Sequence, residues 1–224
     1  MQSQAVLPAL LVFGPQTGLP SLETLAELRQ ELMRHPQLAG LQKAVKSLPQ
    51  FWRTLTEFDP GLNAVQGANY LGSLEQWIDH GVFPQYLIQH SSPNIFALPL
   101  TVILEIILYV RYLSSLEIND AHHHVLQAIR TGGTQGFCVG FLTAIAVNCS
   151  KNEEDMAEIG AVSLRLAVCV GAYVDQLEDG CVPQNHAACI AVRWRTSNQK
   201  FKEEEVTNLI QSYSNVSPSV KRPS

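Results

Sequence analysis

Two glycines flank a cysteine in Gly136-Phe137-Cys138-Val139-Gly140, and this pentapeptide limits the possible folds more than any other segment. In a Gly-x-nucleophile-x-Gly elbow, the chain leaves a strand, turns sharply and enters a helix. The glycines allow a neighbouring backbone to approach closely, and the middle side chain is presented at the mouth of a cleft. The pentapeptide therefore predicts an α/β fold in which Gly136 and Gly140 are the elbow glycines.

Most of the chain before and after the elbow has apolar residues at helical spacing. Ser21 is expected to cap the first helix, and Asn152 is expected to cap the helix that carries Met156, Ile159, Leu166 and Val170 on one face. Small residues in that last helix should let a neighbour pack closely. The expected helical segments are 22–32, 38–45, 51–55, 71–78, 98–116, 121–129, 139–149 and a helix from 152 onward.

Strands are expected at the two ends of the chain. Val6 to Phe13 predicts a buried strand that ends in the tight loop Gly14 to Gly18. Ala188 to Trp194 alternates in the two-residue period of a strand, and Phe201 to Tyr213 has a helical pattern. Ser214 to Ser224 is rich in serine and proline and is expected to be a disordered tail.

Composition excludes several classes of function. The chain has 224 residues, of which 16% are charged, and its net charge is −5, which argues against a nucleic-acid partner. Hydrophobic residues make up 46%, enough for a sizeable core. The apolar run at the N-terminus has no basic residue before it, so no secretory signal is expected. The five cysteines include no CxxC pair, which predicts neither disulfides nor a metal site and favours a cytoplasmic protein.

The stretch from Ile95 to Leu113 is apolar enough to raise the question of a membrane span. Pro99, Glu105 and Arg111 interrupt it, and charged residues are costly inside a bilayer. A buried core helix, with no membrane, is therefore the expectation.

Cys138 would stand at the start of the helix that follows the elbow. Free amides and the positive end of the helix dipole favour a thiolate there, and the thiolate is the nucleophile. The same amides can stabilise the oxyanion of a tetrahedral intermediate, so such a site exchanges acyl groups between thiols without a bound cofactor. The pentapeptide alone is also compatible with a small buried cysteine in a glycine-rich turn.

Five groups of residues, one of which contains the elbow, make the sequence resemble a known family when they are taken in order. It resembles the starter unit:acyl carrier protein transacylase (SAT) domain of fungal non-reducing polyketide synthases over about residues 5–213. The segments that carry the resemblance are Phe13 to Thr17, Pro99 to Ile103 with Tyr109 to Leu113, Arg130 to Gly133, Gln135 to Gly140, and Leu164 to Ala167 with Gly171 to Asp175.

The resemblance implies an acyltransferase fold, in which a helix-rich α/β-hydrolase-like subdomain carries a ferredoxin-like small subdomain. On this basis residues 1–185 form the large subdomain and 186–213 an incomplete small one. Cys138 would be the nucleophile, and the backbone amides of Gln16 and Val139 would form the oxyanion hole. The substrate would be an acyl-CoA or phosphopantetheine thioester, and the partner an acyl carrier protein or polyketide synthase.

The chain departs from the family pattern in one respect. The family's catalytic histidine follows the small subdomain, and this sequence stops within it. Two hypotheses remain open: a starter-unit acyltransferase of fungal polyketide biosynthesis, and an inactive truncated remnant that serves as a protein-interaction module.

The other histidines and cysteines are expected to be structural. His122, His123 and His124 predict a solvated helix face, since consecutive helical residues point about 100° apart and cannot share a metal. Surface or structural roles are expected for His80, His90 and His186. Cys149 and Cys169 are expected in the core, and Cys181 and Cys189 have no assigned role.

Overall fold

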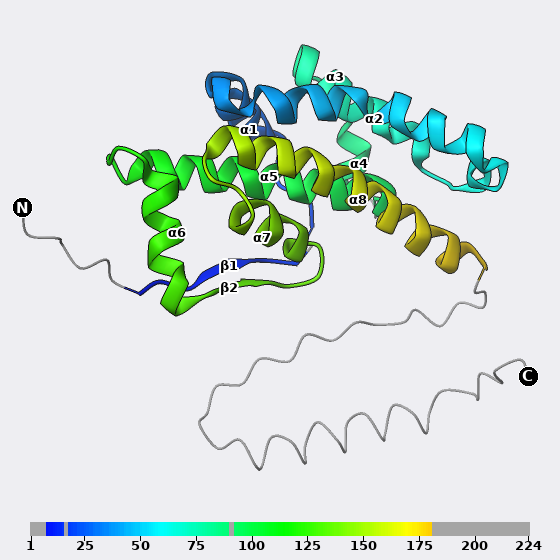
Figure 1. Ribbon diagram of the computed structural model, residues 1–224. Coiled ribbons are helices and arrows are strands. Elements are labelled where there is room, and N and C mark those ends of the chain that lie inside the picture. Colours follow the sequence, from blue (N-terminus) through cyan, green and yellow to red (C-terminus); the bar gives the residue numbers. More distant parts are fainter. Residues whose placement is uncertain (1–7, 16–17, 90–91, 181–224) are drawn as a thin grey trace, which may run out of the picture. The chain divides into compact units, whose positions relative to one another are not determined.

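The computed structural model describes residues 8–15, 18–89 and 92–180 (Figure 1). The chain divides into two compact units, residues 1–182 and 183–224, and the described residues belong to the first. The expected strand at 188–194, the helix at 201–213, the tail at 214–224 and the boundary at 185 lie outside the described residues. The same holds for Gln16, His90, Cys181, His186 and Cys189.

Helices make up most of the described chain, and their order agrees with the periodicity of the sequence. The two patterns at 38–45 and 51–55 form one helix, which continues through Pro49. The helices are α1 (Leu22–Arg34), α2 (Ala39–Phe58), α3 (Leu71–His80), α4 (Gln85–Gln89), α5 (Asn94–Ser115), α6 (Ala121–Gly132), α7 (Gly140–Asn148) and α8 (Glu153–Gly180), with short 3-10 turns at Pro36–Leu38, Pro60–Ala64 and Ala68–Tyr70.

Both expected helix caps, Ser21 and Asn152, are present. The Ser21 side chain accepts a hydrogen bond from the Thr24 amide at 3.2 Å, and the Asn152 side chain accepts one from the Asp155 amide at 2.8 Å. Both satisfy amides in a first helical turn that have no partner within the helix.

A small parallel sheet accompanies the helices, so the described chain is consistent with an α/β fold. Strand β1 (Leu11–Phe13) pairs with β2 (Thr134–Gly136), and the two lie side by side next to α7 (Figure 1). The expected burial of the first strand is only partly correct, because Phe13 is buried whereas Val12 is 49% exposed. Val12 and its register partner Gln135 are both exposed, so among the described residues this face of the two-stranded sheet is open to solvent.

Close packing of α8 against α5 forms the centre of the core. A Cβ atom on Gly160 would lie 2.7 Å from Ile106 Cδ1, and one on Gly171 would meet the backbone of Asn94. The expected face of α8 was partly wrong: Leu166 and Val170 are each 49% exposed. The small residues that contact α5 decide which side of α8 is buried. The side chains of Leu166 and Val170 lie on the other side.

Length and composition alone would let two of the described helices cross a membrane. They are α5 (Asn94–Ser115), for which 72% of the most apolar window is buried in the fold, and Glu153–Leu177 of α8, for which 50% is buried. A core helix meets the same two criteria, so the criteria carry little weight by themselves. The burial of α5 agrees with its expected place in the core.

Asp175 joins the C-terminal half of α8 to the start of α5. Its carboxylate accepts hydrogen bonds from the Asn94 amide, the Asn94 side-chain amide and the Ile95 amide, each at 2.8 Å. The residue is only 7% exposed. A buried carboxylate thus supplies the N-terminal cap that α5 does not obtain from its own sequence.

Replacing Asp175 with alanine should lower the free energy of unfolding by about 2 kcal/mol, because charge-assisted hydrogen bonds to the start of α5 are lost. Urea unfolding would show a lower midpoint with an unchanged slope. Glu154→Ala, at an exposed position of the same helix, is the control and should shift the midpoint little. Equal midpoints for the two variants would contradict this role of Asp175.

His122 is buried, which corrects the expectation of a solvated face for all three consecutive histidines. It is 1% exposed, whereas His123 and His124 are exposed. Its Nδ1 lies 3.0 Å from the Tyr109 hydroxyl and its Nε2 lies 3.0 Å from the Ser150 hydroxyl. These partners from α5 and the α7–α8 turn satisfy both ring nitrogens, so the imidazole can enter the core.

Burial lowers the pKa of His122, although the backbone of Ser150 and then the carboxylate of Glu153 partly oppose the shift. The unfolded chain, in which the group titrates near 6.5, therefore binds more protons than the folded chain in mildly acidic solution. The stability that the neutral, buried His122 contributes is fully present above pH 6.5. It is lost as the pH falls below 6.5 towards the lower pKa of the folded state.

Unfolding measured from pH 7.5 down to pH 5.5 should accordingly show a loss of stability that His122→Gln reduces. The glutamine can still form hydrogen bonds but does not titrate. His123→Gln, on the exposed side of α6, should keep the loss seen in the original protein. A His122→Gln profile parallel to the original would show that His122 does not cause the loss.

Candidate functional site

The turn that carries Cys138 has the geometry of an elbow between a strand and a helix. Strand β2 ends at Gly136, α7 begins at Gly140, and Cys138 between them has a φ of +54° with an exposed side chain. Residues with a side chain rarely adopt this left-handed conformation, and it costs on the order of 1 kcal/mol. Such backbone strain is typical of functional turns.

Backbone hydrogen bonds hold the turn in this conformation. The Phe137 amide donates to the Phe13 carbonyl oxygen of β1 at 3.0 Å. After the turn, the amides of Gly140 and Phe141 donate to the carbonyl oxygens of Phe137 and Cys138 at 3.0 and 3.1 Å. The elbow is therefore tied both to the sheet and to the first turn of α7.

Both flanking glycines stand where a side chain would not fit. A Cβ atom on Gly136 would overlap the backbone of Phe141, and one on Gly140 would overlap the backbones of Phe13 and Gly14. Contacts with backbone atoms cannot be relieved by a rotamer change. These approaches are what the spacing of the two glycines predicts for an elbow.

The start of α7 offers an amide for an oxyanion. Val139 has helical dihedral angles, φ −61° and ψ −28°, and no side chain caps this end of α7. None of the described groups accepts a hydrogen bond from the Val139 amide. Gln16, the other expected donor, lies outside the described residues. The carbonyl oxygen of Gly14, two residues earlier in the sequence, lies directly beside the Gly140 backbone.

A carboxylate that the sequence did not assign to the site lies beneath the elbow. Glu105 of α5 accepts a hydrogen bond from the Thr143 hydroxyl of α7 at 2.5 Å. Partial burial raises the pKa of the Glu105 carboxyl, and the Thr143 hydroxyl and the Gly14 backbone oppose the shift. The available signal was a single acidic residue inside a long apolar segment, which from sequence alone argues only against a membrane span.

Two other cysteines are exposed, which corrects their expected place in the core. Cys149 lies at the C-terminal end of α7, and Cys169 lies on the outward side of α8 together with Leu166 and Val170. Partial burial of its thiol raises the pKa of Cys169. Exposure alone therefore does not distinguish Cys138 from these two cysteines.

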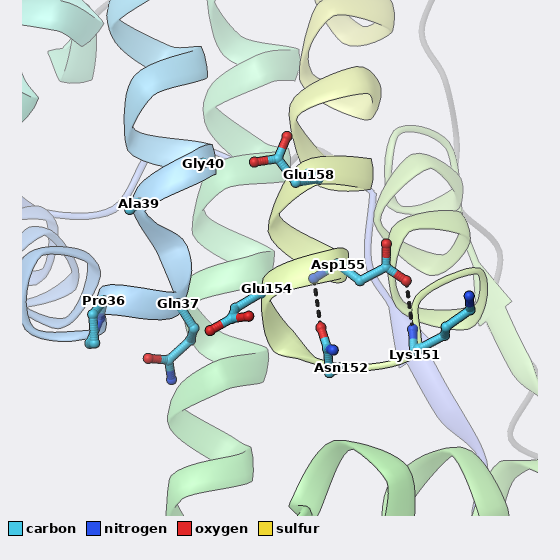
Figure 2. Close-up of a pocket in the computed structure, with 9 residues that line it drawn as sticks. All are labelled: Pro36, Gln37, Ala39, Gly40, Lys151, Asn152, Glu154, Asp155 and Glu158. Atoms are coloured by element: carbon cyan, nitrogen blue, oxygen red, sulfur yellow. Dashed lines mark hydrogen bonds between the residues drawn. The ribbon is translucent and has the colours of Figure 1, made fainter.

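A pocket of about 460 Å³ lies elsewhere, between the starts of α2 and α8 (Figure 2). Several of its polar groups are already paired, since the Asp155 carboxylate accepts from the Lys151 amide and the Asn152 side chain caps α8. Its carboxylates would repel the phosphates of a CoA thioester. The lining residues are Pro36, Gln37, Ala39, Gly40, Lys151, Asn152, Glu154, Asp155 and Glu158.

In the part of the chain that the structure describes, no group of three or more histidine, cysteine or acidic side chains could hold a metal ion. The described groups at the elbow are the exposed Cys138 thiol, the start of α7 and the unpaired Val139 amide.

Comparison with known proteins gives one family model that matches residues 81–224, described as "Starter unit:ACP transacylase in aflatoxin biosynthesis". Curated relatives are fungal synthases. The chain is 38% identical to the 5-methylorsellinic acid synthase of Aspergillus terreus over 96% of its length, and 39% identical to the non-reducing polyketide synthase esdpA of Penicillium shearii over 90%. It is 38% identical to the non-reducing polyketide synthase spyA of Aspergillus fumigatus over 97%.

These relatives are far longer than the chain. The matched region spans 8%, 9% and 12% of the three synthases, respectively. The similarity thus concerns a small part of each synthase.

Brief treatment with iodoacetamide at neutral pH should label Cys138 at least about fivefold faster than each of the other four cysteines. Cys138 precedes the amide end of α7, which favours an anion, whereas Cys149 stands at the carbonyl end and the pKa of Cys169 is raised. Peptide mapping by mass spectrometry measures the five rates in one sample. Equal labelling of Cys138, Cys149 and Cys169 would contradict an activated thiol at the elbow.

Proposed function

Since this chain belongs to the starter unit:ACP transacylase family, we propose that it takes an acyl group from a thioester onto Cys138 and passes it to an acyl carrier protein. The proposed setting is the start of polyketide synthesis in a fungus, as the names of the relatives suggest. Thioester exchange needs no bound cofactor or metal, and we place it in the cytoplasm.

One observation carries this proposal: the exposed Cys138 with a positive φ, between the end of β2 and the start of α7. The strained turn separates the sulfur from the backbone of the helix and leaves it open to a substrate. The neighbouring Val139 amide is free among the described groups, as an oxyanion donor must be.

The proposed reaction has two balanced steps. In the first, the Cys138 thiolate attacks the thioester carbonyl carbon, a new C–S bond forms, and the carbonyl oxygen becomes an oxyanion beside the amides of Val139 and Gln16. Collapse of this intermediate expels the CoA or carrier thiolate, which takes up a proton. In the second step, the phosphopantetheine thiol of the acceptor loses its proton, attacks the Cys138 thioester and releases the Cys138 thiolate.

Both steps need a group that accepts or returns a proton. His122 does not fit this role, because the Tyr109 hydroxyl and the Ser150 hydroxyl already engage its two ring nitrogens. Attack by cysteine depends less on a general base than attack by serine, because a thiolate is already a strong nucleophile.

Incubation with acetyl-CoA or hexanoyl-CoA should increase the intact mass by one acyl group, located on Cys138 by peptide mapping. Cys138→Ala should take up no acyl group, and Cys149→Ala, which removes another exposed thiol, should be acylated like the original. Adding a phosphopantetheinylated carrier protein should then move the acyl group to the carrier. Absence of acylation over hours would refute the transferase and favour a module that binds carrier proteins without chemistry.

A further inference from the structure

We propose that His122 is a positioning residue for the elbow, because its buried ring holds the start of α6, and α6 holds the sheet after which Cys138 stands. This inference rests on the proposed function and deepens it, since it makes the acylation of Cys138 depend on the protonation of His122. His122 does not touch the substrate in this scheme and acts through the backbone of α6.

The hydrogen bonds around His122 determine which ring nitrogen carries the proton. The Ser150 hydroxyl donates its single hydrogen to the Val147 carbonyl oxygen at 2.7 Å, so it can only accept from the imidazole. Nε2, which lies 3.0 Å from this hydroxyl, is therefore the N–H donor, and Nδ1 keeps its lone pair. The Tyr109 hydroxyl, 3.0 Å from Nδ1, donates to it. The neutral Nε2–H form thus satisfies every group in this chain of hydrogen bonds.

A second proton on the ring, at Nδ1, would break this order. Both ring nitrogens of His122 would then donate, so the Tyr109 hydroxyl would have to accept, and its own hydrogen would lose its acceptor. Tyr109 is only 3% exposed, and burial raises the pKa of its hydroxyl, so the phenol does not relieve the conflict by giving up its proton. Protonation of His122 therefore weakens the tie between the start of α6 and α5.

The charged groups around His122 come from the starts of two helices. They are Asp120 ahead of α6, and Glu153, Glu154 and Asp155 of α8. Burial lowers the pKa of the ring, and among the groups that oppose this shift the backbone of Ser150 and the carboxylate of Glu153 come first. The ring is therefore neutral at pH 7.5 and takes up its second proton in acidic solution.

Helix α6 connects this buried ring to both strands of the sheet (Figure 1). Near its end, the Ala128 carbonyl oxygen accepts a hydrogen bond from the Ala9 amide at 3.0 Å. Gly132 lies so close to the Ala9 backbone that a side chain would not fit. The Gly133 carbonyl oxygen then accepts from the Leu11 amide of β1 at 3.1 Å, and the chain continues directly into β2. A shift at the start of α6 is therefore passed to both strands, and β2 ends at the elbow.

A second route leads from His122 to the same end of the sheet. The Tyr109 ring packs edge-on against His122, with centroids 5.8 Å apart, and edge-on against Phe13 of β1, with centroids 6.2 Å apart. The Phe13 carbonyl oxygen accepts from the amide of Phe137, the residue before Cys138, at 3.0 Å. A displaced Tyr109 thus disturbs the strand that holds the elbow.

Four variants separate the positioning role from burial. Glutamine at position 122 can accept from the Tyr109 hydroxyl and donate to the Ser150 hydroxyl but does not titrate, whereas His122→Leu fills the space and keeps neither link. Tyr109→Phe removes only the hydroxyl and keeps the ring. His123→Gln, on the exposed side of α6, is the matched control.

Two rates are measured for Cys138 between pH 7.5 and pH 5.5 by mass spectrometry with peptide mapping. One is acylation by the neutral thioester S-hexanoyl-N-acetylcysteamine, and the other is alkylation by iodoacetamide. Both reactions need the thiolate, so the titration of Cys138 cancels in the ratio of acylation to alkylation. Only acylation passes through an oxyanion, which requires the elbow to hold its geometry.

At pH 7.5 we expect this ratio to fall about 10-fold in His122→Leu and about threefold in Tyr109→Phe, and to stay within about twofold of the original in His122→Gln and His123→Gln. As the pH falls, the ratio should decrease in the original chain and in His123→Gln but stay level in His122→Gln. Long-range ¹H–¹⁵N NMR spectra of the folded chain at pH 7.5 should show His122 as the Nε2–H form.

The outcomes distinguish this inference from the proposed function. If the original chain is acylated and His122→Leu and Tyr109→Phe keep its ratio, the positioning role is wrong and the transferase stands. If the ratio decreases with pH equally in His122→Gln, or if His122 is in the Nδ1–H form, the inference fails. If acylation and alkylation fall together in His122→Leu and Tyr109→Phe, His122 maintains only the fold. If the original chain is not acylated at all, both proposals fail.

Discussion

The direct approach of two backbones, at Gly140 of α7 and Gly14 after β1, is the contact on which the rest of the site depends. It brings segments more than a hundred residues apart in sequence next to each other, and it is possible only because Gly140 has no side chain. The parallel pairing of β1 with β2 aligns the two segments. Cys138 can then adopt its positive φ between the end of β2 and the start of α7.

Helix α5 links this site to the core. Its buried residue Ile106 meets Gly160 of α8, Tyr109 contacts both Phe13 and His122, and Glu105 accepts a hydrogen bond from Thr143 of α7. The position of α5 is itself secured at its start by the Asp175 carboxylate. A change at the α5–α8 contact is therefore expected to reach the elbow through side chains that are already packed.

The segments that make the sequence resemble its family have different structural roles. Gly136 to Gly140 forms the elbow, and its role in catalysis is a proposal. Gly171 and Asp175, by contrast, serve the fold: one allows α8 to approach the start of α5, and the other caps that start. A family pattern thus combines residues of the site with residues that hold its supporting helices together.

Much of the fold was determined by the sequence alone, because helices, their caps at Ser21 and Asn152, and a glycine-flanked turn depend on hydrogen bonds and spacing within a few residues. Tertiary structure decided the burial of particular residues where the periodicity was misleading, as at Leu166 and Val170 of α8. His122 enters the core because α5 and the α7–α8 turn supply partners for both nitrogens, whereas Cys149 and Cys169 face outward. Glu105 meets Thr143 of α7 for the same physical reason: the two residues are distant in sequence, and only the packing of α5 against α7 brings them together.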